Sequence, residues 1–192
     1  HKGSCKRKKI VERLYYLDAQ LPALSVTDDS NQKLPLTVEY FKDLCSRFMS
    51  DKAKIMAENL TLEPPLETGS TGSSFLDQWY EKERNLRLAL AQLRALKMKK
   101  DNKDLPQTSD GEVIQAARTA TGMDSPLSAE QFLNQYRMSL LDKLAPMDMF
   151  SVDAVFNYGL KLMLAERMKK FNRDEGLASY HKIYDSILGE NK

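Results

Sequence analysis

Residues 75–100 read FLDQWYEKERNLRLALAQLRALKMKK, and this stretch indicates the fold class. Apolar residues recur in it at alternating spacings of three and four, the heptad-like pattern of a helix that packs against other helices. We therefore predict one long helix from Phe75 to Lys100, with a single apolar seam along it. The seam consists of Leu76, Trp79, Leu86, Leu90 and Leu93.

Glu83 falls on this seam, between Trp79 and Leu86. A charge at such a position is unfavourable unless it is paired, and Arg87 lies one turn further on, in the order that favours an ion pair within a helix. The favoured interpretation is a solvated pair at the edge of the seam, because exposed helical pairs are common and contribute little. The other interpretation is a polar contact with a partner helix.

The same periodicity predicts helices on both sides of the seam, so we expect an all-α fold, a multi-helix bundle of packed helix pairs. Residues 14–24 fit either a strand or a buried helical turn. Gly159, in the middle of a helix that is apolar all round, predicts a neighbouring helix close to its backbone. The other expected helices are one capped by Thr37, one over 52–60, one over 112–121 ended by Gly122, one opened by Ser125 or Ser128, one capped by Ser151 and running to about Phe171, and one over 174–188 with Leu177, Tyr180, Tyr184, Ile187 and Leu188 on one face.

The expected domain organisation is a basic arm over residues 1–14 followed by a helical domain over 15–192. The arm carries six basic residues against Glu12 within its first thirteen positions, a balance of +5, which leaves −3 for the rest of a chain of net charge +2. We interpret it as a disordered arm or an added extension. The helical domain could form two lobes, 15–61 with 75–100 and 111–192, joined by linkers at 61–74 and 101–110.

The linker at 61–74 ends in GSTGSS, which invites comparison with a phosphate-binding loop. The motif lacks the Gly-Lys-Ser/Thr ending that would bring a lysine to the phosphates. A Pro, Gly, Ser and Thr run of this kind is more typical of a linker.

The composition argues against several function classes. The basic charge rests on the arm alone, so no nucleic-acid partner is expected. Cys5 and Cys45 form no CxxC motif, which suits a reducing cytoplasm. His1 and His181 are the two histidines. Because no nucleophile motif or metal-ligand spacing accompanies them, we expect no catalytic residues, cofactor or metal site. A cleft lined by His181 and carboxylates is the arrangement that would indicate an enzyme instead.

Three blocks of sequence resemble a known family. They read YYLDAQLPALS at 15–25, SFLDQWYEKERNLRLALAQLRA at 74–95, and SPLSAEQFLNQYRMSLLDKL with FSVDAVFNYGLKLMLAERMKKF across 125–171. Together they look like the C-type subunit family of bacterial V-type rotary ATPases and ATP synthases. The family's start matches Tyr15, and the chain is short around residues 100–124 by comparison.

The resemblance implies a helical, non-catalytic subunit that couples the central stalk to the membrane rotor ring during ion transport. It also implies a cytoplasmic protein, held at the inner membrane only through that complex, with the other ATPase subunits as partners. In the stretch similar to proteins of this family, Glu83, Asn85 and Arg87 are candidates for an interhelix or partner contact. The alternative function is a helical scaffold whose Trp79 to Leu93 seam is a groove for another protein, which makes Trp79 a fourth candidate for a partner contact.

Overall fold

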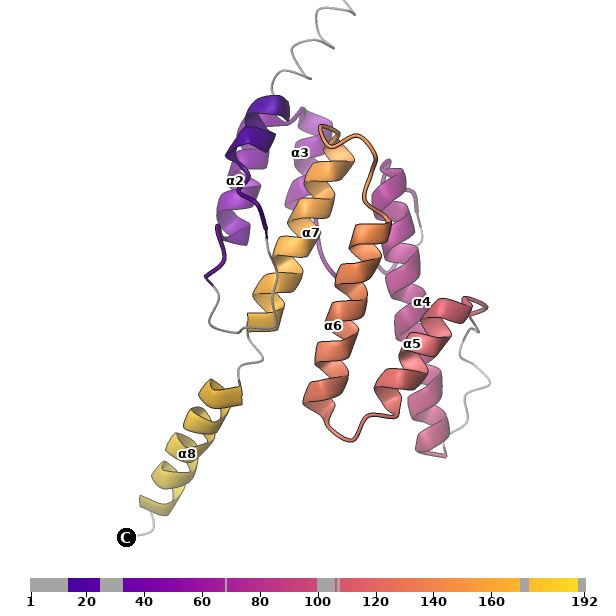
Figure 1. The fold of residues 1–192 in the computed structure, drawn as a ribbon, viewed down its shortest axis with the longest axis vertical. Helices are drawn as coiled ribbons and strands as arrows, with labels where there is room; N and C mark the ends of the chain where they lie inside the picture. The colour runs from indigo at the N-terminus through magenta and orange to yellow at the C-terminus, as the bar shows by residue number, and fades with distance from the viewer. Residues whose placement is uncertain are drawn as a thin grey trace, which may run out of the picture.

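The computed structural model describes residues 14–24, 33–67, 69–99, 106, 108–169 and 173–189. Most positions of the predicted basic arm and of the linker at 101–110 lie outside these ranges. All regular secondary structure among the described residues is helical, which confirms the predicted all-α class (Figure 1). Residues 14–20 form a short helix, so the helical alternative holds for that segment. The longer helices are α2 (Val38–Phe48), α3 (Asp51–Glu58), α4 (Ser74–Lys97), α5 (Gly111–Thr121), α6 (Pro126–Lys143), α7 (Val152–Lys169) and α8 (Arg173–Gly189).

Polar side chains at the predicted positions cap the N-termini of α2, α6 and α7. The hydroxyl of Thr37 accepts a hydrogen bond from the backbone N–H of Tyr40, and Ser151 accepts one in the same way at the start of α7. Of the two starts considered for α6, the structure has Ser125 as the cap with Pro126 directly after it. Each cap satisfies a backbone N–H that has no partner within its helix, so these boundaries depend on local chemistry.

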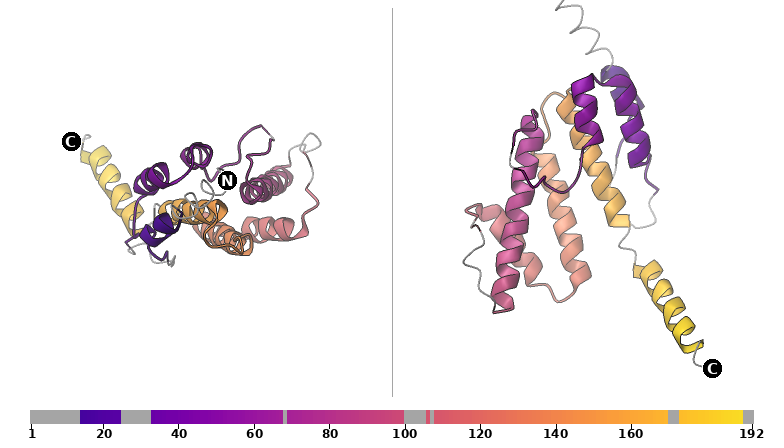
Figure 2. Two further views of the ribbon diagram at one scale, coloured as in Figure 1. Left: turned by 90° about the horizontal axis from the view of Figure 1, so that it is seen from above. Right: turned by 180° about the vertical axis from the view of Figure 1, so that it is seen from behind.

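The helices stand in two rows. Seen from above, α2, α3 and α4 form one row and α7, α6 and α5 form the other (Figure 2, left). α7 contacts α2, α4 and α6, while α5 contacts α4 and α6. α4 and α6 therefore share two neighbours, α5 and α7, and side chains that reach from α4 to α6 lie between these two helices.

Two clusters of buried apolar side chains make up the described core. The larger one joins residues 14–24, α2, α3, the first turns of α4, the end of α6 and α7. The smaller one joins the middle of α4, α5 and the start of α6. α4 and α6 contribute residues to both clusters, so these two helices link them. The division into two lobes at the predicted boundaries stays a prediction.

α7 is the central helix, as its all-round apolar sequence predicts. Its side chains Phe156, Leu160, Leu162 and Leu164 are completely enclosed. α8 differs from it, because the side chains described from residue 177 to residue 187 are exposed and the helix extends away from the bundle in Figures 1 and 2. Within the part of the chain that is described, no helix is both long and apolar enough to cross a membrane.

Candidate functional site

Trp79 lies in the interior of the bundle, with none of its surface exposed. It belongs to the larger core cluster, together with side chains from α6 and α7, while Leu86 and Leu90 of the same seam pack in the smaller cluster. The seam is therefore covered by helices of the same chain. This corrects the hypothesis of a partner groove at Trp79, Leu86 and Leu90, which are buried, while Leu93 at the end of the seam is partly buried.

Glu83 is buried one turn after Trp79, with 2% of its side chain exposed. Arg137 of α6 binds it with two hydrogen bonds: Nε donates to Oε2 and Nη2 donates to Oε1, both at 2.9 Å. Arg137 is itself 7% exposed in its side chain. The paired geometry matches the fork of a guanidinium to the two oxygens of a carboxylate, the strongest form of such a contact.

Arg87 adds a second cation to the same carboxylate. Its Nε donates to Oε1 of Glu83 at 3.0 Å, and its Nη2 reaches Oε1 of Glu63 at 3.4 Å. Burial opposes the charged form of Arg87, but the hydrogen bond and negative charge of Glu83, with a further contribution from Glu63, raise the pKa of the guanidinium above its ordinary value. Arg87 thus joins the buried carboxylate to the segment that precedes α4.

We call Glu83, Arg87, Arg137 and Asn134 the ion cluster, since Arg137 also donates through Nη1 to Oδ1 of Asn134 at 3.4 Å. Glu83 is in an interhelix contact, which is one of the two roles proposed for it. The interpretation as a solvated pair at the edge of the seam is wrong, because the Glu83 side chain is enclosed between α4 and α6.

Asn85 is half-buried on a different side of α4 from the ion cluster. Two residues along an α-helix correspond to a turn of about 200°, so its side chain points away from that of Glu83. Of the four candidate residues from the sequence, the structure brings Glu83 and Arg87 together, places Trp79 beside them in the core, and separates Asn85.

Arg137 and Asn134 are the members of the ion cluster that sequence reasoning missed. Arg137 occupies a core-facing position of α6, four residues after Leu133 and four before Leu141, both of which are buried. An arginine on the apolar face of one predicted helix and a glutamate on the apolar face of another are together a signal for a buried ion pair. The two periodicities alone do not say which two helices meet.

The segment before α4 is anchored on both of its sides. Ser73 caps α4 by accepting from the backbone N–H of Leu76, and its hydroxyl donates to Oδ1 of Asp153 in α7 at 2.6 Å. The Arg84 guanidinium donates to the carbonyl of Pro65. Composition predicts a linker here, and the structure shows that the described part of it is tied to α4 and α7.

The carboxylate of Asp77 binds hydrogen-bond donors of Ser70 and Thr71 in the GSTGSS motif. The backbone N–H and the hydroxyl of Thr71 each donate to Oδ1 at 2.7 Å, and the hydroxyl of Ser70 donates to Oδ2 at 2.7 Å. Partial burial opposes the charged form, but these three hydrogen bonds hold the pKa of Asp77 below its ordinary value. Three donors of the loop are thus bound to a carboxylate of the same chain, in agreement with the linker interpretation.

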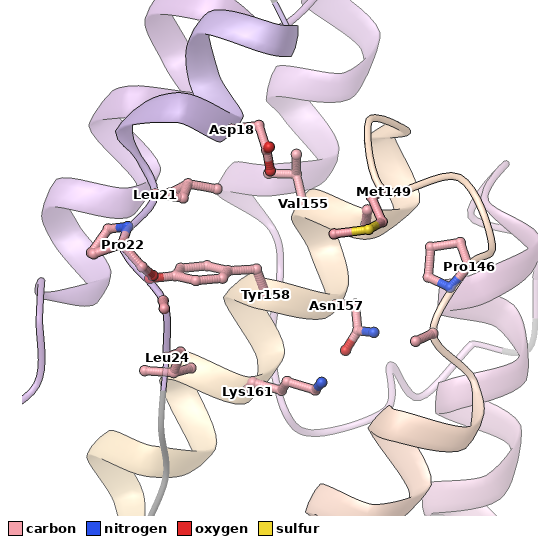
Figure 3. Close-up of a pocket in the computed structure, with 13 residues that line it drawn as sticks. Asp18, Leu21, Pro22, Leu24, Pro146, Met149, Val155, Asn157, Tyr158 and Lys161 are labelled. Carbon is pink, nitrogen blue, oxygen red and sulfur yellow. The ribbon is translucent and has the colours of Figure 1, made fainter.

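A pocket of about 300 Å³ lies between residues 18–24, the connection after α6, and α7 (Figure 3). The Tyr158 side chain points toward Pro22, and its hydroxyl donates to the Pro22 carbonyl at 2.9 Å. Burial raises the pKa of Tyr158 to about 12, so the hydroxyl stays a donor at neutral pH. The contact fixes residues 18–24 as one wall of the pocket. The other walls are mainly apolar and include Ala145, Pro146, Met149 and Val155.

His181 lies on the exposed side of α8, beside the ring of Tyr180. It lines neither the pocket of Figure 3 nor a second pocket between Pro65 and Arg84. The cleft of His181 and carboxylates that would indicate an enzyme is therefore not formed around this residue by the described part of the chain. Among the residues that the structure describes, no group of three or more His, Cys, Asp or Glu side chains could hold a metal ion.

One comparison with known proteins gives a match. A family model described as "Protein of unknown function (DUF2764)" matches residues 120–191, a segment that includes α6, α7 and α8. No curated protein and no solved structure matches the chain. The matched segment thus includes α8 together with α6 and α7 of the second row of the bundle. The description of the family assigns no activity to this segment.

Proposed function

We propose that this protein is a non-catalytic subunit of a V-type rotary ATPase, which couples the central stalk to the membrane rotor ring. The proposal starts from the resemblance of three sequence blocks to the C-type subunit family. It places the chain on the cytoplasmic face of the inner membrane through its contacts with other subunits. Torque transmission, without ATP hydrolysis by this chain, is the role that follows.

The observation that carries the proposal is that the three blocks meet in the fold. The first block contacts the third where the Tyr158 hydroxyl donates to the carbonyl of Pro22. The second block contacts the third where Arg137 binds Glu83. Segments separated by more than fifty residues thus form one interior, which is expected if the blocks resemble one folded unit of a related protein.

The ion cluster suits a joint that carries load. A buried, doubly hydrogen-bonded ion pair adds little net stability compared with apolar packing, but separating its charges leaves an unpaired charge in the interior. Sliding of α4 along α6 would separate Glu83 from Arg137 and is therefore strongly opposed. A torque-transmitting subunit needs helices whose register does not slip.

A scaffold that binds through the Trp79 to Leu93 seam is not supported, because the seam packs inside the chain. An exposed apolar face does exist on α8, formed by side chains that include Tyr180 and Tyr184. A scaffold function would therefore act through α8 and not through α4.

The test is affinity purification of the full chain from its source cell. The gene is tagged at the end remote from α8, membranes are dissolved in a mild detergent, and the bound proteins are identified by mass spectrometry. We expect the catalytic subunits of the rotary ATPase and its rotor-ring subunit in amounts comparable to the bait. The same tag on an unrelated cytosolic helical protein is the control.

A reciprocal purification decides the outcome. If a tagged catalytic subunit brings down an otherwise complete complex that reproducibly lacks this chain, the proposal is wrong. If the bait brings down a stable set of proteins without ATPase subunits, the scaffold hypothesis replaces it.

A further inference from the structure

α8 carries an exposed apolar face. Leu177, Tyr180, Ile183 and Tyr184 expose 46%, 61%, 60% and 50% of their surface. The matched family segment includes this helix together with α6 and α7, so α8 belongs to the same unit as two core helices. An amphipathic helix that presents tyrosine and aliphatic side chains to water is typical of an interaction surface.

The spacing of the face indicates a helical partner. Leu177, Tyr180, Tyr184 and Ile187 follow one another at intervals of three, four and three residues, which are successive inner positions of a heptad. Side chains at this spacing fill the holes of another helix that runs nearly parallel or antiparallel to the first.

The order of residues along the face is the same in both directions. From either end it reads aliphatic, tyrosine, tyrosine, aliphatic, with its centre near residue 182. A second α8 in antiparallel orientation would place Leu177 against Ile187 and Tyr180 against Tyr184 of the other copy. A surface that matches itself after a half-turn is what a twofold symmetric dimer requires.

The aromatic rings and the neighbouring isoleucine support this pairing. Tyr180 and Tyr184 stack on each other with ring centroids 6.0 Å apart and planes 20° apart, so together they form one aromatic patch. Two such patches can cover each other at the centre of the interface. Ile183 lies beside the face and, in the same antiparallel arrangement, would approach Ile183 of the second copy.

The charges of the helix are compatible with self-association. Between residues 177 and 187 the charged side chains are Lys182 and Asp185, and both stand on the side opposite the apolar face. No like charges would therefore meet across the pair, and antiparallel helices set the positive end of one dipole beside the negative end of the other. A membrane surface is disfavoured as the occupant, because a helix that binds anionic lipid carries several Lys or Arg residues on its polar side.

We propose that α8 joins two copies of this protein as an antiparallel helix pair through Leu177, Tyr180, Ile183, Tyr184 and Ile187. This inference is independent of the rotary ATPase proposal, since it concerns purified protein alone. The seam covers only about two heptads, so we expect a moderate affinity, on the order of 10 to 100 micromolar.

The test is sedimentation equilibrium of the full chain over a wide concentration range. We expect the average mass to rise from 21.9 kDa toward twice that value as the concentration increases. The double variant Tyr180→Glu with Tyr184→Glu should weaken association at least about tenfold, because it places charges at the centre of the interface. Ser179→Glu, on the polar side of the same helix, is the matched control and should associate as the unchanged protein does.

Circular dichroism shows whether the variants retain their helices, which we expect because α8 lies outside both core clusters. A chain that stays monomeric at the highest concentration overturns the proposal. Association that persists in the double tyrosine variant also overturns it, because the contact would then lie elsewhere.

Disulfide trapping tests the orientation. In a Cys5→Ser background, protein with Tyr180→Cys is mixed with an isotopically labelled protein carrying Tyr184→Cys and is mildly oxidised. The antiparallel pair predicts disulfides between residue 180 of one copy and residue 184 of the other. Disulfides that join only like residues, 180 to 180 and 184 to 184, would contradict that orientation and with it the proposed interface.

Discussion

The ring of Phe41 in α2 lies against the backbone of Gly159 in α7. A Cβ atom at position 159 would stand 2.6 Å from two carbons of that ring and 2.8 Å from Cδ2 of Leu60. Phe41 is completely buried, so it has no solvent-filled space into which to move. The glycine predicted to mark a close helix crossing does so.

Gly159→Ala should therefore destabilise the protein. Overpacking a filled core costs about 1 to 3 kcal/mol, which exceeds the gain of about 1 kcal/mol that alanine brings to a helix interior. Urea denaturation followed by circular dichroism measures the free energy of unfolding. Gly111→Ala is the matched control, because a Cβ at that position meets nothing within 4 Å. Equal stability of the Gly159→Ala variant and the unchanged protein would show that α2 does not press against α7.

Arg137→Met should lower the free energy of unfolding more than the same substitution at an exposed arginine. It leaves the Glu83 carboxylate in the interior with only the partly exposed Arg87, and breaking a buried pair costs about 3 to 5 kcal/mol. In the double variant Glu83→Met with Arg137→Met no buried charge remains, so part of the stability should return. Denaturation midpoints of the two single variants and the double variant give the coupling between the residues.

Arg47→Met is the control for that series. Its ion pair with Asp43 is exposed, with 61% and 44% of the two side chains in contact with solvent, and such pairs contribute about 1 kcal/mol or less. If Arg137→Met behaves like Arg47→Met, the ion cluster does not hold α4 against α6.

The hydrogen bonds of Asp77 predict a dependence of stability on pH. Because folding lowers the pKa of this carboxyl, its contribution is fully present above the ordinary value of 3.8 and is lost as the pH falls through the lower value of the folded state. Asp77→Asn should be less stable at neutral pH and should lose less stability on acidification. Urea midpoints at a series of acidic pH values test this, with Thr71→Val, which removes one donor, as an intermediate case. Parallel curves for Asp77→Asn and the unchanged protein would contradict it.

Cys45 should resist thiol reagents in the folded protein. It is buried, and burial raises the pKa of its thiol to about 12, so almost no thiolate is present at neutral pH. In a Cys5→Ser background we expect negligible alkylation by iodoacetamide under native conditions and complete alkylation in denaturant, as read by mass spectrometry. Rapid native labelling would show that α2 opens readily from α7.

Much of the secondary structure could be predicted from the sequence, because helices depend on short-range order. The three-and-four spacing from Phe75 onward predicts α4 almost to its ends, and Thr37, Ser125 and Ser151 mark helix starts by their side-chain chemistry. The candidate site could be predicted only in part. Glu83 stands out in the sequence as a charge on an apolar seam, but its main partner lies 54 residues away in the chain.

The sequence by itself determined that the chain is helical, where most helices begin, and that α8 has one apolar side, since each of these follows from neighbours within a few residues. Only the tertiary structure decided that α4 faces α6, that Trp79 is enclosed and that the α8 face is exposed. Burial and ion pairing between distant segments depend on which helices meet, and similar apolar seams on several helices permit more than one arrangement until their side chains are packed together.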